Sequence, residues 1–168
     1  MGKNIVFIGL SGSGKTTIGR AVAEKLCLPF YDVDSYIEEK EKKPIKDIFV
    51  QGEVFFRRLE AEAITELSKN YPAVISTGGG AVKLPGNMKI LRNNSLVIFI
   101  NRPLENIIEN IDISNRPLLR EGKESLYALY KERYALYKAY CDAELINDSS
   151  LEEMIIKTVE LIKMTICS

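Results

Sequence analysis

The stretch NIVFIGLSGSGKTT, residues 4–17, joins an unbroken apolar run to a glycine-rich loop and decides the fold class. Its first part, NIVFIG at 4–9, is typical of a parallel strand that is buried on both faces. Its second part matches the phosphate-loop pattern G-x-x-x-x-G-K-S/T at Gly9, Gly14, Lys15 and Thr16. The helical pattern KTTIGRAVAEKL at 15–26 follows directly, so the motif lies between a strand and a helix, as its chemistry requires.

A loop of this kind binds the phosphates of a nucleotide triphosphate. Its glycines let successive backbone N–H groups point into one concavity, and the N-terminus of the helix adds partial positive charge. Lys15 can reach the β- and γ-phosphates, and the Thr16 hydroxyl can hold Mg²⁺. We therefore predict that ATP and Mg²⁺ bind here. The predicted ATP contacts are Gly12, Ser13, Gly14, Lys15, Thr16 and Thr17.

Strand-like and helix-like segments alternate along the rest of the chain. The predicted strands are 4–9, FYDVD at 30–34, AVIS at 73–76, LVIFI at 96–100 and AELIN at 143–147. The longer helical patterns lie at 15–26, 53–69, 103–111, 125–140 and 150–164. This alternation favours an α/β fold, a three-layer sandwich in which a five-stranded parallel sheet lies between helices. The polar stretch at 112–124 is long for a connection and is a candidate for a mobile lid.

The composition favours one cytoplasmic domain without a nucleic-acid or membrane partner. The 168 residues suit a single domain, and Lys+Arg and Asp+Glu both number 23, which gives no support for nucleic-acid binding. No apolar run approaches the roughly 20 residues that span a bilayer, and the N-terminus shows no signal-peptide cleavage pattern. The three cysteines have no metal-binding spacing and suit reduced thiols. Because the chain has no histidine, acid–base work must fall to carboxylates, Lys or Arg.

Missing motifs narrow the class of nucleotide-binding protein. The chain has no N-K-x-D motif and no D-x-x-G after the second predicted strand, which disfavours a GTPase switch. It has no hydrophobic strand that ends in Asp-Glu, which disfavours a motor-type ATPase. A small-molecule kinase becomes the leading class.

The carboxylates of Asp32 and Asp34 end the second predicted strand. Alternation along a strand would put both on the same side, and ligands of open parallel sheets lie beyond the carboxyl ends of the strands. One carboxylate could orient Mg²⁺, and the other could accept a hydrogen bond from an attacking hydroxyl. The alternative is that both belong to a turn or a helix cap, because a helical pattern follows Asp34.

Three arginines are candidates for binding anionic groups. Arg57 lies on a predicted helix between Glu53 and Glu60, so a plain surface ion pair is an equal alternative. Arg133 lies on a tyrosine-rich helix, where the tyrosines more often serve packing. Arg116 lies in the irregular segment, where a lid arginine could close over the γ-phosphate.

A second glycine run, STGGG at 76–80, follows the third predicted strand. It leaves the sheet at the same edge as the phosphate loop, so it could line the wall that faces an acceptor. Bare backbone at Gly79 would leave room and offer an N–H group. The alternative is a tight turn between a strand and a helix.

Six motifs together resemble the shikimate kinase family. They are GLSGSGKTT, FYDVD, FRRLE, STGGGAV, RPLL and ERYALY, in this order between residues 9 and 137. The phosphate loop alone is not specific, but its combination with the other motifs is. The resemblance implies a nucleoside monophosphate kinase fold with sheet order 2-3-1-4-5, an acceptor-binding helical region at about 33–62 and a lid at about 112–124. It also implies a monomer that phosphorylates the 3-hydroxyl of shikimate with ATP.

The resemblance implies roles for residues on the acceptor side. Asp34 would hold the reacting hydroxyl, and Gly79 would contact shikimate through its backbone. Arg57 and Arg133 would grip the carboxylate, which suits the bidentate geometry of guanidinium groups. Glu60 would support the arginine cluster.

On the donor side, the resemblance implies that Lys15 and Arg116 stabilise the transferring phosphoryl group. Arg116 would also contact ATP, and Thr16 with Asp32 would serve Mg²⁺. The chain departs from the family pattern at Ala135, which replaces the usual proline of R-x-P-L-Y. It also lacks the arginine that family members often carry about eight residues before R-P-L-L.

Two other functions remain open from the sequence. One is a small P-loop kinase that acts on a nucleoside monophosphate or on a sugar acid such as gluconate. The other is a nucleotide-binding regulatory protein without turnover. The intact Lys15, Asp34 and Arg116 argue against the second, and the arginines with the T-G-G-G run favour shikimate over a nucleotide acceptor.

Overall fold

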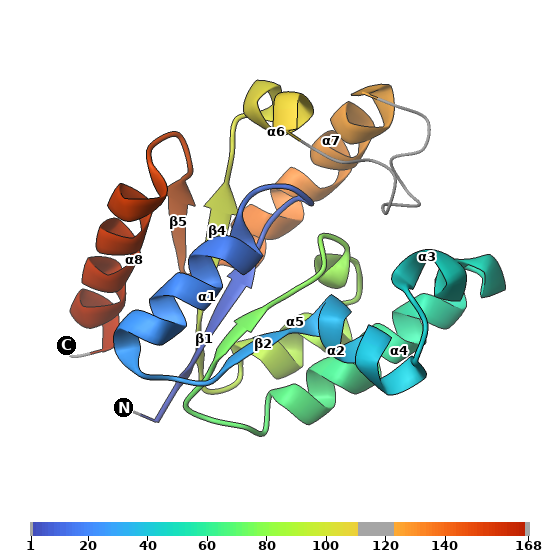
Figure 1. The fold of residues 1–168 in the computed structure, drawn as a ribbon, viewed down its shortest axis with the longest axis horizontal. Coiled ribbons are helices and arrows are strands. Elements are labelled where there is room, and N and C mark those ends of the chain that lie inside the picture. The colour runs from blue at the N-terminus through green and yellow to red at the C-terminus, as the bar shows by residue number, and fades with distance from the viewer. Residues whose placement is uncertain (1, 111–122, 167–168) are drawn as a thin grey trace.

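The computed structural model describes residues 2–110 and 123–166. Its centre is a five-stranded sheet in the order β2-β3-β1-β4-β5, in which every neighbouring pair is parallel (Figure 1). The strands are β1 (Asn4–Ile8), β2 (Phe30–Asp32), β3 (Val74–Ser76), β4 (Ser95–Asn101) and β5 (Ala143–Ile146). The predicted fold class and strand order are confirmed.

Helices cover both faces of this sheet. The α-helices are α1 (Lys15–Leu26), α2 (Val33–Glu41), α3 (Ile45–Ile48), α4 (Glu53–Leu67), α5 (Pro85–Arg92), α6 (Leu104–Asn110), α7 (Lys123–Tyr140) and α8 (Leu151–Ile166). Two short 3₁₀ helices are η1 (Phe49–Gln51) and η2 (Ala81–Lys83). Figure 1 shows α1 and α8 on one side, with α2, α3 and α4 grouped at the far end of the molecule from α8.

The unbroken apolar run of β1 is explained by two separate cores. Ile5 and Phe7 belong to the core beneath α1 and α8. Val6 and Ile8 belong to the core on the opposite face, which α4, α5 and α7 cover. A strand that is buried on both faces must be apolar at every position, because successive side chains point to opposite sides of the sheet.

The second strand ends earlier than the sequence predicted. β2 stops at Asp32 and α2 begins at Val33, so Asp34 lies in the first turn of a helix and not on the strand. The argument that strand alternation aligns Asp32 with Asp34 is therefore wrong. Asp32 is the N-cap of α2, because its Oδ1 accepts a hydrogen bond of 3.0 Å from the N–H of Ser35. The capping alternative is correct for Asp32, and both carboxylates still lie at the carboxyl edge of the sheet.

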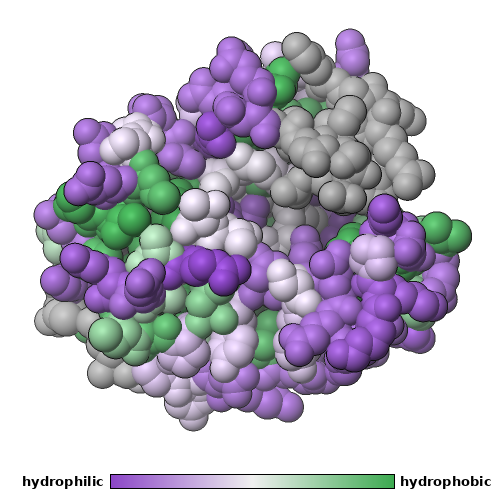
Figure 2. Space-filling view, viewed as in Figure 1, coloured by the Kyte–Doolittle hydropathy of each residue, from purple (hydrophilic) through white to green (hydrophobic). Residues whose placement is uncertain are grey.

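The predicted lid falls largely outside the described residues. Residues 112–122 of that segment, with Arg116, lie outside them, and residues 123 and 124 already belong to α7. None of the helices described here is long and apolar enough to cross a membrane. Figure 2 shows hydrophilic residues gathered over α2 and α4, whereas hydrophobic residues gather towards α8.

Candidate active site

The phosphate loop follows β1 and leads into α1. A Cβ atom at Gly9 would overlap the carbonyl oxygen of Ile100 in the neighbouring strand, and Gly9 has a positive φ of 146°. Only glycine allows this close approach. The Lys15 side chain is buried and lies back along the loop, where its Nζ donates hydrogen bonds of 2.8 Å to the carbonyls of Gly9 and Leu10. Lys15, which the sequence predicts to contact the ATP phosphates, is therefore hydrogen-bonded to the loop that contains it.

Two further side chains hold this loop from outside. Asn147 Nδ2 donates a hydrogen bond of 2.8 Å to the Ser13 carbonyl, and Arg102 Nη1 donates one of 3.4 Å to the Gly12 carbonyl. In a trans peptide the N–H points opposite to the C=O, so fixing the Ser13 carbonyl also fixes the direction of the Gly14 N–H. Asn147 thus orients a donor that the motif assigns to phosphate.

The sequence reasoning missed both of these residues. Arg102 is the first residue after β4, and Asn147 is the first residue after β5. Both residues lie at or just after the ends of predicted strands, and ligands of open parallel sheets bind at the carboxyl ends of the strands. This position could have identified them from the sequence. Arg102 precedes α6, so it does not occupy the position of the arginine that family members often carry about eight residues before R-P-L-L.

Asn147→Ala is expected to weaken ATP binding about two- to tenfold, because the Ser13 carbonyl loses its donor and the Gly14 peptide loses its orientation. Titration calorimetry with ATP measures this. Asn93→Ala is the matched control, because Asn93 is exposed at the opposite end of β4. Equal ATP affinity in the two variants would show that Asn147 does not orient the loop.

The two residues predicted for Mg²⁺ are in direct contact. Thr16 Oγ1 donates a hydrogen bond of 2.7 Å to Asp32 Oδ2, and the buried Ser76 hydroxyl lies 3.4 Å from Thr16 Oγ1. Mg²⁺ takes oxygen ligands and is often held by one or two protein groups plus substrate phosphates, so this donor set fits it. Within the described ranges, no group of three or more Asp, Glu, Cys or His side chains forms a metal site independent of such phosphates.

The glycine run after β3 lies against the charged side chains of the site. A Cβ atom at Gly78 would lie 2.9 Å from both Asp34 Oδ1 and Glu60 Oε1. A Cβ atom at Gly80 would overlap the guanidinium of Arg57 and lie 2.5 Å from its Cζ. Neither glycine has a positive φ, so space and not backbone conformation requires glycine here. Close packing against these side chains is therefore a reason for glycine at both positions in addition to the turn between strand and helix.

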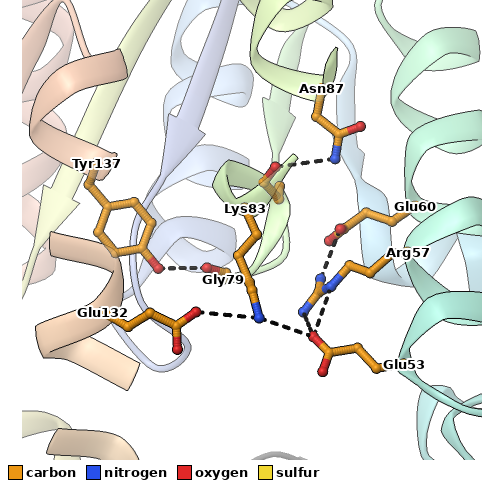
Figure 3. A network of polar contacts seen from close by, with 9 residues as sticks. Glu53, Arg57, Glu60, Gly79, Lys83, Asn87, Glu132 and Tyr137 are labelled. Atoms are coloured by element: carbon orange, nitrogen blue, oxygen red, sulfur yellow. Dashed lines mark hydrogen bonds and ion pairs between the residues drawn. The ribbon is translucent and has the colours of Figure 1, made fainter. Parts of the chain in front are cut away.

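Gly79 lies between the phosphate loop and α7. A Cβ atom there would lie 3.0 Å from the backbone nitrogen and the Oγ of Ser11, and 3.6 Å from Arg133 Nη1. The hydroxyl of Tyr137, which is buried, donates a hydrogen bond of 2.6 Å to the Gly79 carbonyl (Figure 3). Burial raises the pKa of Tyr137, so the hydroxyl remains a donor throughout the physiological range. Tyr137 thus holds the Gly79 backbone close to the phosphate loop.

Arg57 is buried, and it forms the ion pairs with Glu53 and Glu60 that the sequence left as the alternative. Its Nη1 donates a hydrogen bond of 2.8 Å to Glu60 Oε2, and the Glu60 side chain is fully buried. Burial raises the pKa of Glu60, while the neighbouring Arg57 acts in the opposite direction. The neighbouring Arg58, by contrast, is exposed and lies 3.9 Å from Glu62. Burial therefore distinguishes Arg57 from Arg58, and a ligand-binding role for Arg57 stays a prediction.

Arg133 supplies a second buried guanidinium. Its exposed fraction is 2%, and its Nε and Nη2 find no hydrogen-bond partner among the residues that the structure describes. Buried donors are normally paired, because leaving them unpaired is costly. A guanidinium with two such donors is therefore suited to an anionic ligand that supplies the missing acceptors.

Gly80→Ala is expected to weaken binding of shikimate, the acceptor that the motif resemblance implies, about tenfold or more, because the new methyl group must displace the Arg57 guanidinium. The backbone angles of Gly80, φ −100° and ψ 0°, are open to alanine, so the variant should fold. Titration calorimetry with shikimate measures the affinity. The control is Gly86→Ala, where nothing lies within 4 Å of the added atom. Unchanged affinity in Gly80→Ala would mean that Arg57 does not contact the ligand.

The predicted site residues that the structure describes lie at one edge of the sheet. The phosphate loop, Asp32, Asp34 and the glycine run follow β1, β2 and β3. Arg57 and Arg133 reach this edge from α4 and α7, which lie far apart in the sequence. Arg116 lies outside the described residues. The edge therefore combines a phosphate-binding loop with a pair of buried guanidinium groups.

Comparison with known proteins agrees with this combination. The family model for shikimate kinase matches residues 11–163. The chain is 51% identical to the shikimate kinase of Clostridium botulinum over 154 residues, which cover 91% of this chain and 93% of the relative. Shikimate kinase from Acinetobacter baumannii in complex with shikimate has a TM-score of 0.91 at 31% identity, covering 98% of this chain and 93% of that one. Shikimate kinase from Aquifex aeolicus has a TM-score of 0.84 at 32% identity, covering 95% and 96%. The chain belongs to the shikimate kinase family.

Proposed function

We propose that this protein transfers the γ-phosphoryl group of ATP to the 3-hydroxyl of shikimate. The products are shikimate 3-phosphate and ADP, in the biosynthesis of aromatic amino acids. The observation that carries the proposal is the buried guanidinium of Arg133. Gly79 lies between this guanidinium and Ser11 of the phosphate loop. A site that binds a nucleotide triphosphate beside an anion-binding arginine suits a phosphoryl acceptor that carries a carboxylate.

Arg57 and Arg133 bind the carboxylate of shikimate. Arg133 offers its Nε and Nη2, the pair of donors that meets a carboxylate side-on. Arg57 already donates from Nε and Nη2 to Glu53 and from Nη1 to Glu60. Tyr137 holds Gly79 between this pair and the phosphate loop, so the backbone of Gly79 lines the acceptor site.

Asp34 holds the hydroxyl that is phosphorylated. Its carboxylate lies against Gly78, where the missing Cβ leaves room for the Asp34 and Glu60 carboxylates. Asp34 accepts the hydrogen bond of the hydroxyl, which directs an oxygen lone pair at the γ-phosphorus, and it receives the proton as the new O–P bond forms. Phosphoryl transfer depends mainly on such positioning and on stabilisation of charge.

The donor side belongs to the phosphate loop and the lid. Residues 12–17 hold the phosphates, and Lys15 neutralises the charge that develops on the transferring group. Thr16 and Asp32 hold Mg²⁺, which supplies further charge neutralisation when it is bound. We assign Arg116 to the same group of phosphate contacts from the lid at about 112–124, as its motif implies.

Several wider statements stay predictions. They are the acceptor-binding role of the helical region at about 33–62, a single domain over 1–168, a monomeric state and a cytoplasmic location. The region 33–62 comprises α2, α3, η1 and the first ten residues of α4, and it carries Asp34 and Arg57. This supports its assignment to the acceptor.

Turnover is expected with shikimate and not with gluconate or a nucleoside monophosphate. Only shikimate combines a carboxylate, which the arginines can bind, with a carbocyclic ring that can lie against the glycine run at 78–80. A coupled assay of ADP release with these acceptors measures this. Turnover with another acceptor but not with shikimate would overturn the proposal. ATP binding without turnover on any acceptor would favour a regulatory nucleotide-binding protein.

Asp34→Asn is expected to lower kcat by a factor of about 10² or more, because an amide cannot take the hydroxyl proton. ATP affinity should change little, since Asp34 lies on the acceptor side. Steady-state kinetics and ATP titration measure the two effects. Glu39→Gln removes an exposed carboxylate from the same helix and should leave both values unchanged. An unaltered kcat in Asp34→Asn would remove this residue from the mechanism.

A further inference from the structure

An ionic network links the two helices that supply the acceptor arginines. Figure 3 shows Lys83 between Glu53 of α4 and Glu132 of α7. The Nζ of Lys83 lies 3.5 Å from Glu53 Oε1 and 3.3 Å from Glu132 Oε1. Lys83 is the last residue of η2, which follows the glycine run directly. None of these three side chains has a role in the proposed transfer reaction.

Glu53 already binds the guanidinium that the acceptor needs. Its Oε1 accepts hydrogen bonds of 3.2 Å from Arg57 Nε and 3.1 Å from Arg57 Nη2. These two nitrogens form one edge on which a guanidinium receives a carboxylate. Glu53 thus occupies with one oxygen the edge of Arg57 that a bidentate carboxylate would occupy with two.

The ionic network around the arginines has equal numbers of cations and carboxylates, and Asp34 is a further carboxylate close to Glu60. Its three cations are Arg57, Arg133 and Lys83, and its three carboxylates are Glu53, Glu60 and Glu132. An incoming carboxylate adds a negative charge close to Glu53, and like charges at this distance repel each other. Glu60 cannot easily move away from the incoming carboxylate because its side chain is fully buried. The Glu53 side chain is 39% exposed and can move.

We propose that Glu53 is an internal counter-ion of Arg57 that the acceptor carboxylate displaces, and that Lys83 receives Glu53 when this happens. Lys83 is placed for this because it already contacts the same oxygen, Oε1, that Arg57 holds. Glu53 thereby lowers the affinity for the acceptor, and Lys83 raises it. Both act through Arg57, so they are positioning residues. The inference rests on the proposed function, because it requires an acceptor with a carboxylate.

The exchange has a consequence for selectivity. An anion that contacts Arg57 alone replaces Glu53, which carries the same charge, so the exchange contributes little binding free energy. An acceptor that also satisfies the open donors of Arg133 gains a second contact for the same displacement. The Glu53–Arg57 pair therefore favours ligands whose carboxylate reaches both guanidinium groups.

Glu53→Gln is expected to lower the KM and the calorimetric Kd for shikimate about two- to fivefold, the range for a partly exposed charge pair. Lys83→Met is expected to raise both by a similar factor, and Lys83→Arg should restore them. The KM for ATP and kcat should stay constant, which a general loss of structure would not allow. Glu62→Gln is the matched control, because Glu62 lies on the exposed face of the same helix beside Arg58.

The double variant Glu53→Gln/Lys83→Met separates two ways in which Lys83 could act. If Lys83 works by receiving Glu53, its loss has no further effect once residue 53 is uncharged. A Lys83→Met effect that persists in the double variant would show that Lys83 binds the acceptor directly, which overturns the exchange. An unchanged or weaker shikimate affinity in Glu53→Gln would overturn it as well. If the unaltered protein fails to phosphorylate shikimate, the proposed function fails instead, so the two failures are distinguishable.

Discussion

The close approach of the Gly78–Gly80 backbone to charged side chains is the constraint on which the site depends. Each of the three glycines faces a different functional group, and a side chain at any of them would meet a neighbour at 3.0 Å or less. The run connects the acid of α2, the guanidinium of α4 and the phosphate loop over a few ångströms. Strand β3 makes this possible, because it lies between β2 and β1 and ends at the same edge.

The local part of this arrangement could be predicted from the sequence. The strand–loop–helix unit at 4–26 follows from apolar runs, glycine spacing and helical periodicity, which are local properties of the chain. The boundary after Asp32 could not be predicted with the same security. The segment FYDVD alternates like a strand, yet Asp32 caps a helix through Ser35, so two local signals compete at this position.

Contacts between distant segments lay beyond the sequence pattern. Asn147 lies 134 residues from the Ser13 carbonyl that it holds, and no spacing rule links the two. The burial of Arg57 was undecided for the same reason, because the sequence shows its helical neighbours Glu53 and Glu60 but not Gly80 above its guanidinium. The motif resemblance did imply that Arg57 and Arg133 act together. It could do so because family motifs reflect residues that the complete fold brings together.

Two buried guanidinium groups at one site would repel each other if nothing compensated their charge. Glu60 provides that compensation, because it pairs with Arg57 and also feels the charge of Arg133. Its burial fixes its position, and while Glu60 is ionised the three groups together carry one positive charge in excess. Glu53 compensates the remainder from a more exposed position and is therefore the partner that can yield. The division between a fixed and a replaceable carboxylate gives a physical reason why the site can be stable on its own and still accept an anionic ligand.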